Sequence, residues 1–157
     1  MKVDGTHYRA IWRDADTGEV MILDQRWLPH RFEIERLKDW PEMVTAIRDM
    51  HIRGAGAIGA AAGFGMYLAV SAAGESDLET TIERAALKLK KARPTAINLE
   101  WAVDRQLQML QDGHSKSGKK EIALRVAQEL MLKGNQFTSW AWTQHLKDAG
   151  VRSEVEA

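Results

Sequence analysis

The feature that most constrains the fold is a run of 21 residues without a charged side chain, from Gly54 to Gly74. A run of this length is nominally sufficient to span a bilayer as a helix. Six of its residues are glycine and eight are alanine, however, so the run is only weakly apolar, and such small side chains favour close packing between helices. We therefore expect a buried helix over about residues 57–73, in the core of a helical domain, and no association with a membrane.

Short strands are expected before this helix. Residues 6–12 and 19–25 have strand composition and flank residues 14–18, whose Asp-Ala-Asp-Thr-Gly sequence is typical of a turn. Residues 32–35 then alternate apolar and charged side chains, which predicts a third, half-buried strand. The segment from residue 5 to 38 thus predicts three short antiparallel strands.

Helical periodicity begins after these strands. Asp39 and Glu42 form a helix-start signal, and Met43, Ile47 and Met50 follow at helical spacing. Beyond the charge-free run, capping signals at residues 76–79 and at Thr95 begin two more helices, and Arg93-Pro94 ends the first of them. A last helix follows an exposed loop at 112–118. The expected apolar stripes are Leu78, Ile82, Ala85, Ala86 and Leu89; Leu99, Val103, Leu107 and Leu110; and Ile122, Val126 and Leu130.

Together these patterns predict an α+β fold, with a small antiparallel three-stranded sheet followed by a bundle of four or more helices. A chain of 157 residues matches the usual size of a single domain. We expect a strand-plus-helix-bundle domain over residues 1–134. Residues 135–157 are expected to form a divergent helical and polar tail of the same domain, with a helix around the aromatic segment 137–142.

Charge and composition exclude several classes of function. The 22 basic residues balance the 22 acidic ones, so no global field attracts nucleic acid. The absence of cysteine excludes disulfides, thiolate metal sites and a cysteine nucleophile. No apolar signal segment begins the chain, so we expect a cytoplasmic location. We expect no metal and no cofactor, because no helical pair or carboxylate cluster of metal spacing accompanies the histidines, which are His7, His30, His51, His114 and His145. His51 is interpreted as a partly buried side chain near a helix end.

The motif that suggests chemistry lies at the start of the charge-free run. Residues 53–59 read Arg-Gly-Ala-Gly-Ala-Ile-Gly, and their glycines fit the G-x-G-x-x-G pattern of dinucleotide-binding loops. That loop requires a strand that runs into the first glycine, whereas residues 44–52 continue a helical pattern, so we reject a dinucleotide site. Two interpretations remain: a packing junction between helices, or an anion site made by Arg53 and the N–H groups of the helix start.

The same block resembles the R-G-A-P-A-I-G block of the methylthioribose-1-phosphate isomerases. Three further parts of the first 110 residues or so resemble that family, in the same order along the chain. They are Tyr-Arg-Ala-Ile-Trp at 8–12 with Ile-Leu-Asp-Gln at 22–25, Leu-Pro-His at 28–30, and Ala-Arg-Pro-Thr-Ala-Ile-Asn-Leu at 92–99. The wider family includes ribose-1,5-bisphosphate isomerase and the alpha, beta and delta subunits of translation initiation factor 2B.

The resemblance implies an amino-terminal domain that precedes a larger Rossmann-like domain. It also implies an aldose-ketose isomerase, an intramolecular oxidoreductase of methionine salvage. In that family the sugar phosphate contacts the residues that correspond to Arg53, Gly54, Ala55 and Arg93. The catalytic cysteine and aspartate belong to the second domain, so the resemblance assigns no catalytic residue to this sequence.

Two departures from the family pattern matter. Gly56 stands where the family has proline, which loosens the turn and predicts weaker phosphate binding. After about residue 125 the sequence no longer resembles the family. With no cysteine in the sequence, we expect the chain alone to be inactive.

Three hypotheses follow. The chain is part of a sugar-phosphate isomerase, binds the phosphate weakly and depends on a separate catalytic domain or chain. Alternatively, it is a non-catalytic regulatory or protein-interaction module like the initiation factor subunits. In the third hypothesis it is a stand-alone helical domain without a ligand. A domain without its usual covering partner would expose apolar surface, so self-association is also expected.

Overall fold

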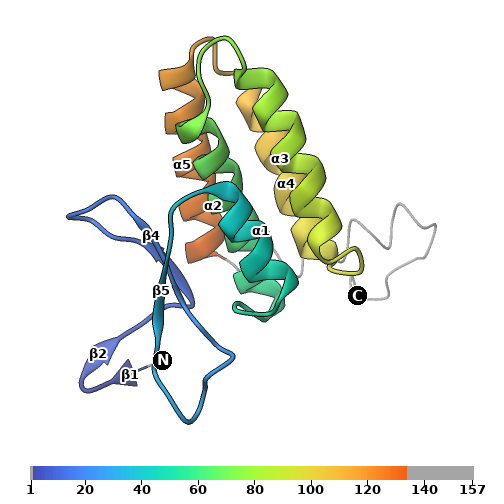
Figure 1. Cartoon of the computed structure of the whole chain (residues 1–157). Coiled ribbons are helices and arrows are strands. Elements are labelled where there is room, and N and C mark those ends of the chain that lie inside the picture. Colours follow the sequence, from blue (N-terminus) through green and yellow to red (C-terminus); the bar gives the residue numbers. More distant parts are fainter. Residues whose placement is uncertain (1, 134–157) are drawn as a thin grey trace, which may run out of the picture.

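The charge-free run forms the central helix of the protein. A computed structural model describes residues 2–133, and in it α2 extends over Ala55–Ala72 (Figure 1). Of its 18 residues, 13 are buried, which confirms the expected core helix. Among the described residues, α2 is the one helix that is long and apolar enough to cross a membrane, but 72% of that stretch is buried inside the protein.

Four more helices pack around α2. Small side chains on α2 allow close approach: a Cβ added to Gly63 would lie 2.8 Å from Leu130 Cδ1 and 3.1 Å from Ala127 Cα. The surrounding helices are α1 (Trp40–Arg48), α3 (Leu78–Ala92), α4 (Ile97–Leu110) and α5 (Lys116–Leu132).

Helices α2 and α4 run in the same direction. Gly59, near the start of α2, lies against Asn98 and Ala102 near the start of α4. One turn further along, the buried Gln106 Nε2 donates to the Gly63 carbonyl at 3.0 Å. The first turns of α2 and α4 therefore lie at the same end of the bundle (Figure 1).

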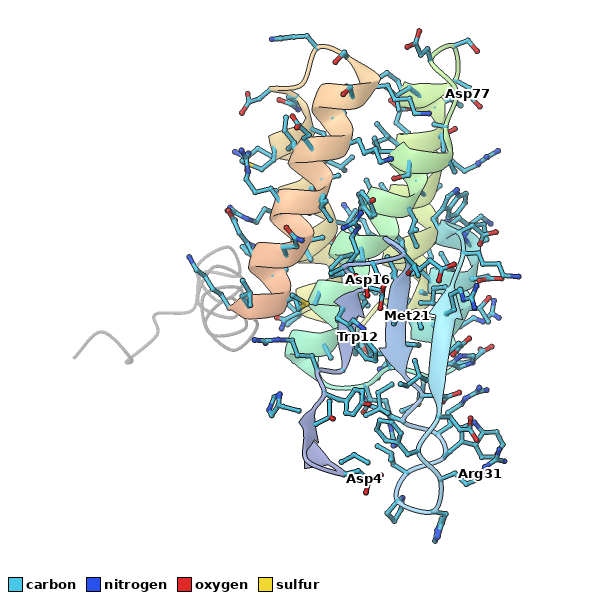
Figure 2. The ribbon with its side chains drawn as sticks, turned by 90° about the vertical axis from the view of Figure 1, so that its left-hand side faces the viewer. Asp4, Trp12, Asp16, Met21, Arg31 and Asp77 are labelled. Carbon is cyan, nitrogen blue, oxygen red and sulfur yellow. The ribbon has the colours of Figure 1, made fainter. Side chains whose placement is uncertain are left out.

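The expected three-stranded antiparallel sheet is present. Its strands lie in the order β3 (Ile11–Arg13), β4 (Val20–Leu23) and β5 (Ile34–Leu37). The expected strand at 6–12 is divided, because β1 (Lys2–Val3) and β2 (Thr6–His7) form a separate hairpin. In Figure 2 this hairpin, marked by Asp4, and the loop that carries Arg31 lie at the end of the molecule opposite Asp77.

One face of the sheet packs against the helices. Ile11, Ile22 and Leu37 are buried there. The third strand, expected at residues 32–35 from its alternation of apolar and charged side chains, lies at Ile34–Leu37. Ile34 is 40% exposed, whereas Glu35 pairs in register with the buried Ile22 and so faces the helices. An inward carboxylate needs a partner, which is described below.

The start of α1 is confirmed in detail. Asp39 is its N-cap and accepts from the Glu42 N–H at 2.9 Å. Met50, expected on the same apolar stripe, instead lies beyond the helix end with φ +62° and is 42% exposed. The chain turns sharply there to reach α2.

Other capping signals were only partly right. Helix α3 ends at Ala92, directly before Arg93-Pro94, as expected. Its N-cap Asp77 makes no side-chain cap hydrogen bond, and α4 begins after Ala96 rather than Thr95. Ser115 caps α5 by accepting from the Gly118 N–H at 3.0 Å, so the loop expected at 112–118 ends earlier. The predicted helix at 137–142 and the predicted tail 135–157 lie outside the described residues.

Candidate functional site

The glycine-rich motif forms a junction between two helices. A turn at residues 49–54, and no strand, leads from α1 into Gly54, as the rejection of a dinucleotide loop required. Gly54 adopts φ +98°, a conformation that favours glycine. The first intrahelical bond runs from the Ile58 N–H to the Gly54 carbonyl at 2.8 Å. The N–H groups of residues 55–57 thus precede the intrahelical hydrogen bonds, as at any helix start.

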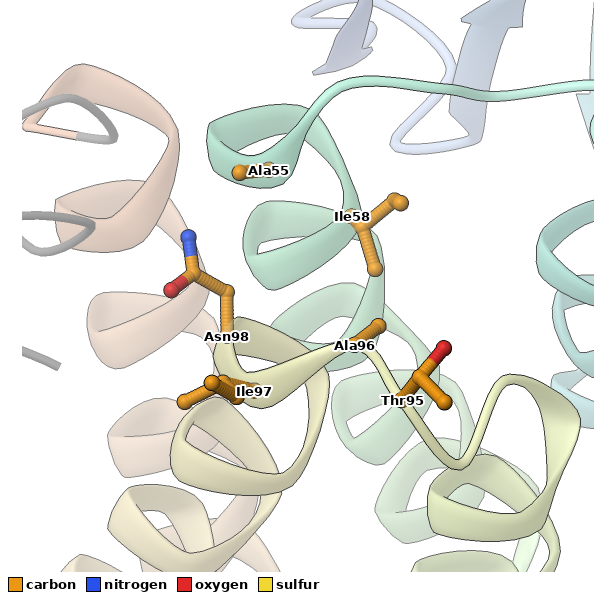
Figure 3. A pocket seen from close by; sticks show the side chains of 6 residues that line it. All are labelled: Ala55, Ile58, Thr95, Ala96, Ile97 and Asn98. Carbon is orange, nitrogen blue, oxygen red and sulfur yellow. The ribbon is translucent and has the colours of Figure 1, made fainter. Parts of the chain in front are cut away.

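A cavity of 190 Å³ lies beside this helix start (Figure 3). Ala55 and Ile58 of α2 line one side of it. The opposite side is formed by Thr95 and Ala96, which lead into α4, and by the first two residues of α4, Ile97 and Asn98. No side chain caps α2 or α4, in contrast to α1 and α5. The positive ends of two helix dipoles therefore lie at the same cavity.

The two arginines expected at the site lie close in sequence to the residues that line this cavity. Arg53 is exposed and lies two residues before Ala55, while Arg93 is half-buried and lies two residues before Thr95. Neither is itself a lining residue. Arg53 Nη2 donates to the backbone carbonyl of Gln25 at 3.0 Å. Of the four residues expected to contact phosphate, Gly54 and Ala55 lie at the start of α2. Along the chain, Arg53 precedes the α2 side of the cavity and Arg93 precedes the α4 side.

Gln25, two residues after the end of β4, forms hydrogen bonds with the segment that carries Arg53. The Gln25 N–H donates to the His51 carbonyl at 2.8 Å. The Gln25 side-chain amide donates to the Arg53 backbone carbonyl at 3.2 Å. The Gln25 backbone carbonyl in turn accepts from the Arg53 guanidinium. The two contacts between Gln25 and Arg53 join residues 28 positions apart. Sequence spacing gave no sign of them, although Gln25 belongs to a block that resembles the isomerases.

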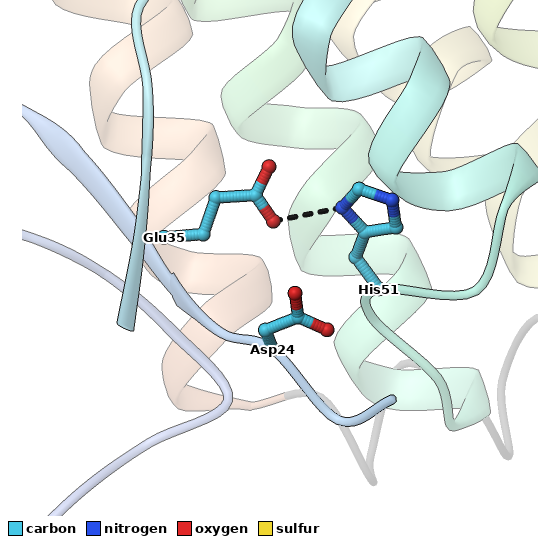
Figure 4. Close-up of side chains that lie close together, drawn as sticks. All are labelled: Asp24, Glu35 and His51. Carbon is cyan, nitrogen blue, oxygen red and sulfur yellow. Dashed lines mark hydrogen bonds and ion pairs between the residues drawn. The ribbon is translucent and has the colours of Figure 1, made fainter. Parts of the chain in front are cut away.

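Behind this segment lies a polar cluster that the sequence did not reveal (Figure 4). His51 Nδ1 lies 2.7 Å from Glu35 Oε2, and Asp24 is the third member. His51 is 8% exposed and Asp24 is 4% exposed. The inward register of β5 was the missing signal, because it brings Glu35 to the buried His51.

Asp24 is already paired. Its Oδ1 and Oδ2 accept from Arg26 Nε at 2.9 Å and Nη2 at 2.6 Å. These hydrogen bonds hold the pKa of Asp24 below its ordinary value, against the opposing effect of burial. Asp24, Glu35 and His51 offer ligand atoms within 4.8 Å of one another, but a cation would have to displace the Arg26 guanidinium from Asp24. We interpret the cluster as an ion-pair network that supports residues 51–53.

Comparison with known proteins identifies the family. Residues 51–146 match the sequence model of the initiation factor 2 subunit family. The chain is 46% identical over 110 residues to a methylthioribose-1-phosphate isomerase of Methylorubrum extorquens, a match that covers 70% of the chain. The family match extends past residue 125, so the expectation that the resemblance ends there was wrong.

Two solved structures resemble the described fold. The delta subunit of translation initiation factor eIF-2B from A. fulgidus has a TM-score of 0.73 and 32% identity. The 5-methylthioribose 1-phosphate isomerase of Pyrococcus horikoshii has a TM-score of 0.66 and 35% identity. Each match covers 79% of this chain.

The chain is short beside these relatives. It spans 29% of the Methylorubrum isomerase and 36% and 35% of the two solved chains. The sequence match, the α+β fold and the glycine-rich helix junction nevertheless agree with one another. The chain belongs to the initiation factor 2 subunit family.

Proposed function

We propose that this chain supplies the phosphate-binding part of a sugar-phosphate aldose-ketose isomerase that acts on methylthioribose-1-phosphate. The observation that carries the proposal is the shared cavity at the starts of α2 and α4, with Arg53 and Arg93 each two residues before a segment that lines it. In our proposal the phosphate accepts hydrogen bonds from the N–H groups around Gly54 and Ala55. Arg53 binds it from one side and Arg93 closes from the other.

The proposed site is weak by itself. A helix dipole and one charge-assisted arginine fork each contribute on the order of 1 kcal/mol at a partly exposed position. Contributions of this size are too small for tight binding, so we expect a Kd no tighter than roughly millimolar, which corresponds to a binding free energy of about −4 kcal/mol. Tighter binding requires contacts from another domain or chain.

The chemistry also requires a further part. Interconversion of an aldose and a ketose moves a proton or hydride between the first two sugar carbons, which needs positioned acid-base groups. The cavity is lined by alanine, isoleucine, threonine and asparagine, none of which titrates near neutral pH. The resemblance assigns the reaction to a cysteine and an aspartate of a second domain. We propose that these come from a separate domain or chain.

Phosphate titration of the isotope-labelled protein tests the site. We expect inorganic phosphate at millimolar concentration to shift the amide signals of residues 54–57 most strongly. Arg53→Ala should abolish these shifts, because it removes the charged fork beside the helix start. Arg93→Ala should weaken binding several-fold.

Arg84→Ala provides the matched control, since Arg84 is an exposed arginine of α3 that packs over Trp40, away from the cavity. It should leave the phosphate shifts unchanged. Equal shifts in wild type and Arg53→Ala would make the glycine-rich junction a packing feature only.

A second function is favoured by one observation, the higher TM-score of the initiation factor subunit. In this alternative the chain is a regulatory or protein-interaction module without chemistry. The two functions differ when a catalytic second domain is added: recovered turnover supports the isomerase. Stable association with that domain without turnover supports the protein-interaction module. In that alternative we also expect the chain to associate with itself. In both cases we propose a cytoplasmic protein that binds neither nucleic acid nor a membrane.

A further inference from the structure

Gln25 contacts the phosphate-site segment through three hydrogen bonds. Its backbone N–H holds the His51 carbonyl at 2.8 Å, and its side-chain Nε2 holds the Arg53 carbonyl at 3.2 Å. Its own carbonyl accepts from Arg53 Nη2 at 3.0 Å. A single residue at the end of β4 therefore contacts both the backbone and the guanidinium of Arg53.

The side-chain bond fixes the direction of a neighbouring donor. The Arg53 carbonyl and the Gly54 N–H belong to one planar peptide unit and point in opposite directions. When Gln25 Nε2 donates to the Arg53 carbonyl, the Gly54 N–H therefore points away from the Gln25 side chain. No other side chain packs against Gly54, which is exposed and has nothing within 4 Å of the position a Cβ would take.

We propose that Gln25 is a positioning residue for the anion site. Its side chain holds the peptide unit before Gly54 and its carbonyl holds the Arg53 guanidinium, so both groups are arranged before the ligand arrives. This inference rests on the proposed phosphate site. Preorganisation of this kind improves affinity because less freedom is lost on binding.

The Asp24–Glu35–His51 cluster supports the same segment from behind. The Glu35 contact anchors the His51 side chain while Gln25 holds the His51 carbonyl. Residue 51 is thereby fixed independently of the Gln25 side chain. Removal of that side chain should loosen residues 53 and 54 without unfolding the junction.

Gln25→Ala and Gln25→Glu test the proposal. Alanine removes the side-chain amide, and with it the Nε2 bond to the Arg53 carbonyl, but leaves both backbone contacts. Glutamate keeps the shape, cannot donate when ionised and offers Arg53 a competing carboxylate. We expect the Kd for inorganic phosphate to rise three- to tenfold in Gln25→Ala and further in Gln25→Glu. Gln111 is an exposed glutamine at the opposite end of α4. The Kd of Gln111→Ala for inorganic phosphate should match that of wild type.

A measurement without ligand separates this inference from the proposed function. Backbone order parameters of Arg53 and Gly54 should fall from rigid values near about 0.85 towards about 0.6 in both Gln25 variants, with the midpoint of thermal unfolding nearly unchanged. If wild type binds no phosphate, the proposed function fails, and the order parameters still decide whether Gln25 fixes the turn. Unchanged order parameters, or unchanged phosphate affinity in variants of a wild type that binds, would overturn the inference.

Discussion

At the residue scale, the segment that carries Arg53 is packed against polar side chains at the inner face of the sheet. Asp24 follows the buried Leu23 at the end of β4, and Glu35 pairs with the buried Ile22. Each would be costly to bury alone. Arg26 satisfies the first and His51 the second, and the pair of contacts fixes the approach to Arg53.

Asp24→Asn should reveal the Asp24–Arg26 pair through its pH dependence. Because the hydrogen bonds from Arg26 lower the pKa of Asp24 in the folded state, the pair stabilises the protein above the unfolded-state pKa, about 3.9. This contribution is lost as the pH falls through the folded-state pKa. At pH 7 the variant should lose about 2 kcal/mol, the usual worth of hydrogen bonds to a charged group.

Urea unfolding at pH 7 and at about pH 3 measures this difference. The free-energy gap between wild type and Asp24→Asn should narrow at the lower pH. Asp112→Asn, at an exposed position after α4, should show a small effect at both. A gap that stays constant or widens on acidification would mean that Arg26 does not hold the Asp24 carboxylate.

At the element scale, α2 sets the architecture through its small residues. The run without charges was enough to predict its approximate length and its burial, because so many small side chains favour a helix that packs closely against other helices. Asp39 likewise marked the start of α1 from local chemistry alone. The positions that local patterns missed, Met50, Ala96 and Glu35, are set by how the chain turns and pairs at long range.

Two glycines of α2 should respond in opposite ways to alanine. At Gly63 the added methyl would lie 2.8 Å from Leu130 and 3.1 Å from the α5 backbone, so Gly63→Ala should destabilise by about 1–3 kcal/mol. At Gly59 its nearest neighbours would be at 3.7 Å, an ordinary contact. Gly59→Ala should therefore stabilise by about 0.5–1 kcal/mol through helix propensity. Chemical denaturation measures both, and equal signs would contradict the packing of α5 on α2.

At the scale of the whole molecule, the candidate site is assembled from segments far apart in sequence. The Arg53 motif and the Arg93 block could be found from the sequence because each resembles the family locally. The two blocks reach the same cavity because α2 and α4 pack in parallel. The spacing of apolar residues in the sequence does not predict that packing. The hydrogen bond from Gln25 to Arg53 was equally hidden, since a contact across 28 residues leaves no local pattern.

The central claim, that this chain binds the sugar phosphate without converting it, is tested most directly by a titration of the labelled protein with methylthioribose-1-phosphate, observed by NMR over time. We expect amide shifts at residues 54–57 together with residues 95–98, weak affinity, and no ketose signal, because binding orients the phosphate but supplies no acid-base pair. Shifts confined to other parts of the chain would contradict the claim. So would ketose formation above background that survives a contamination control.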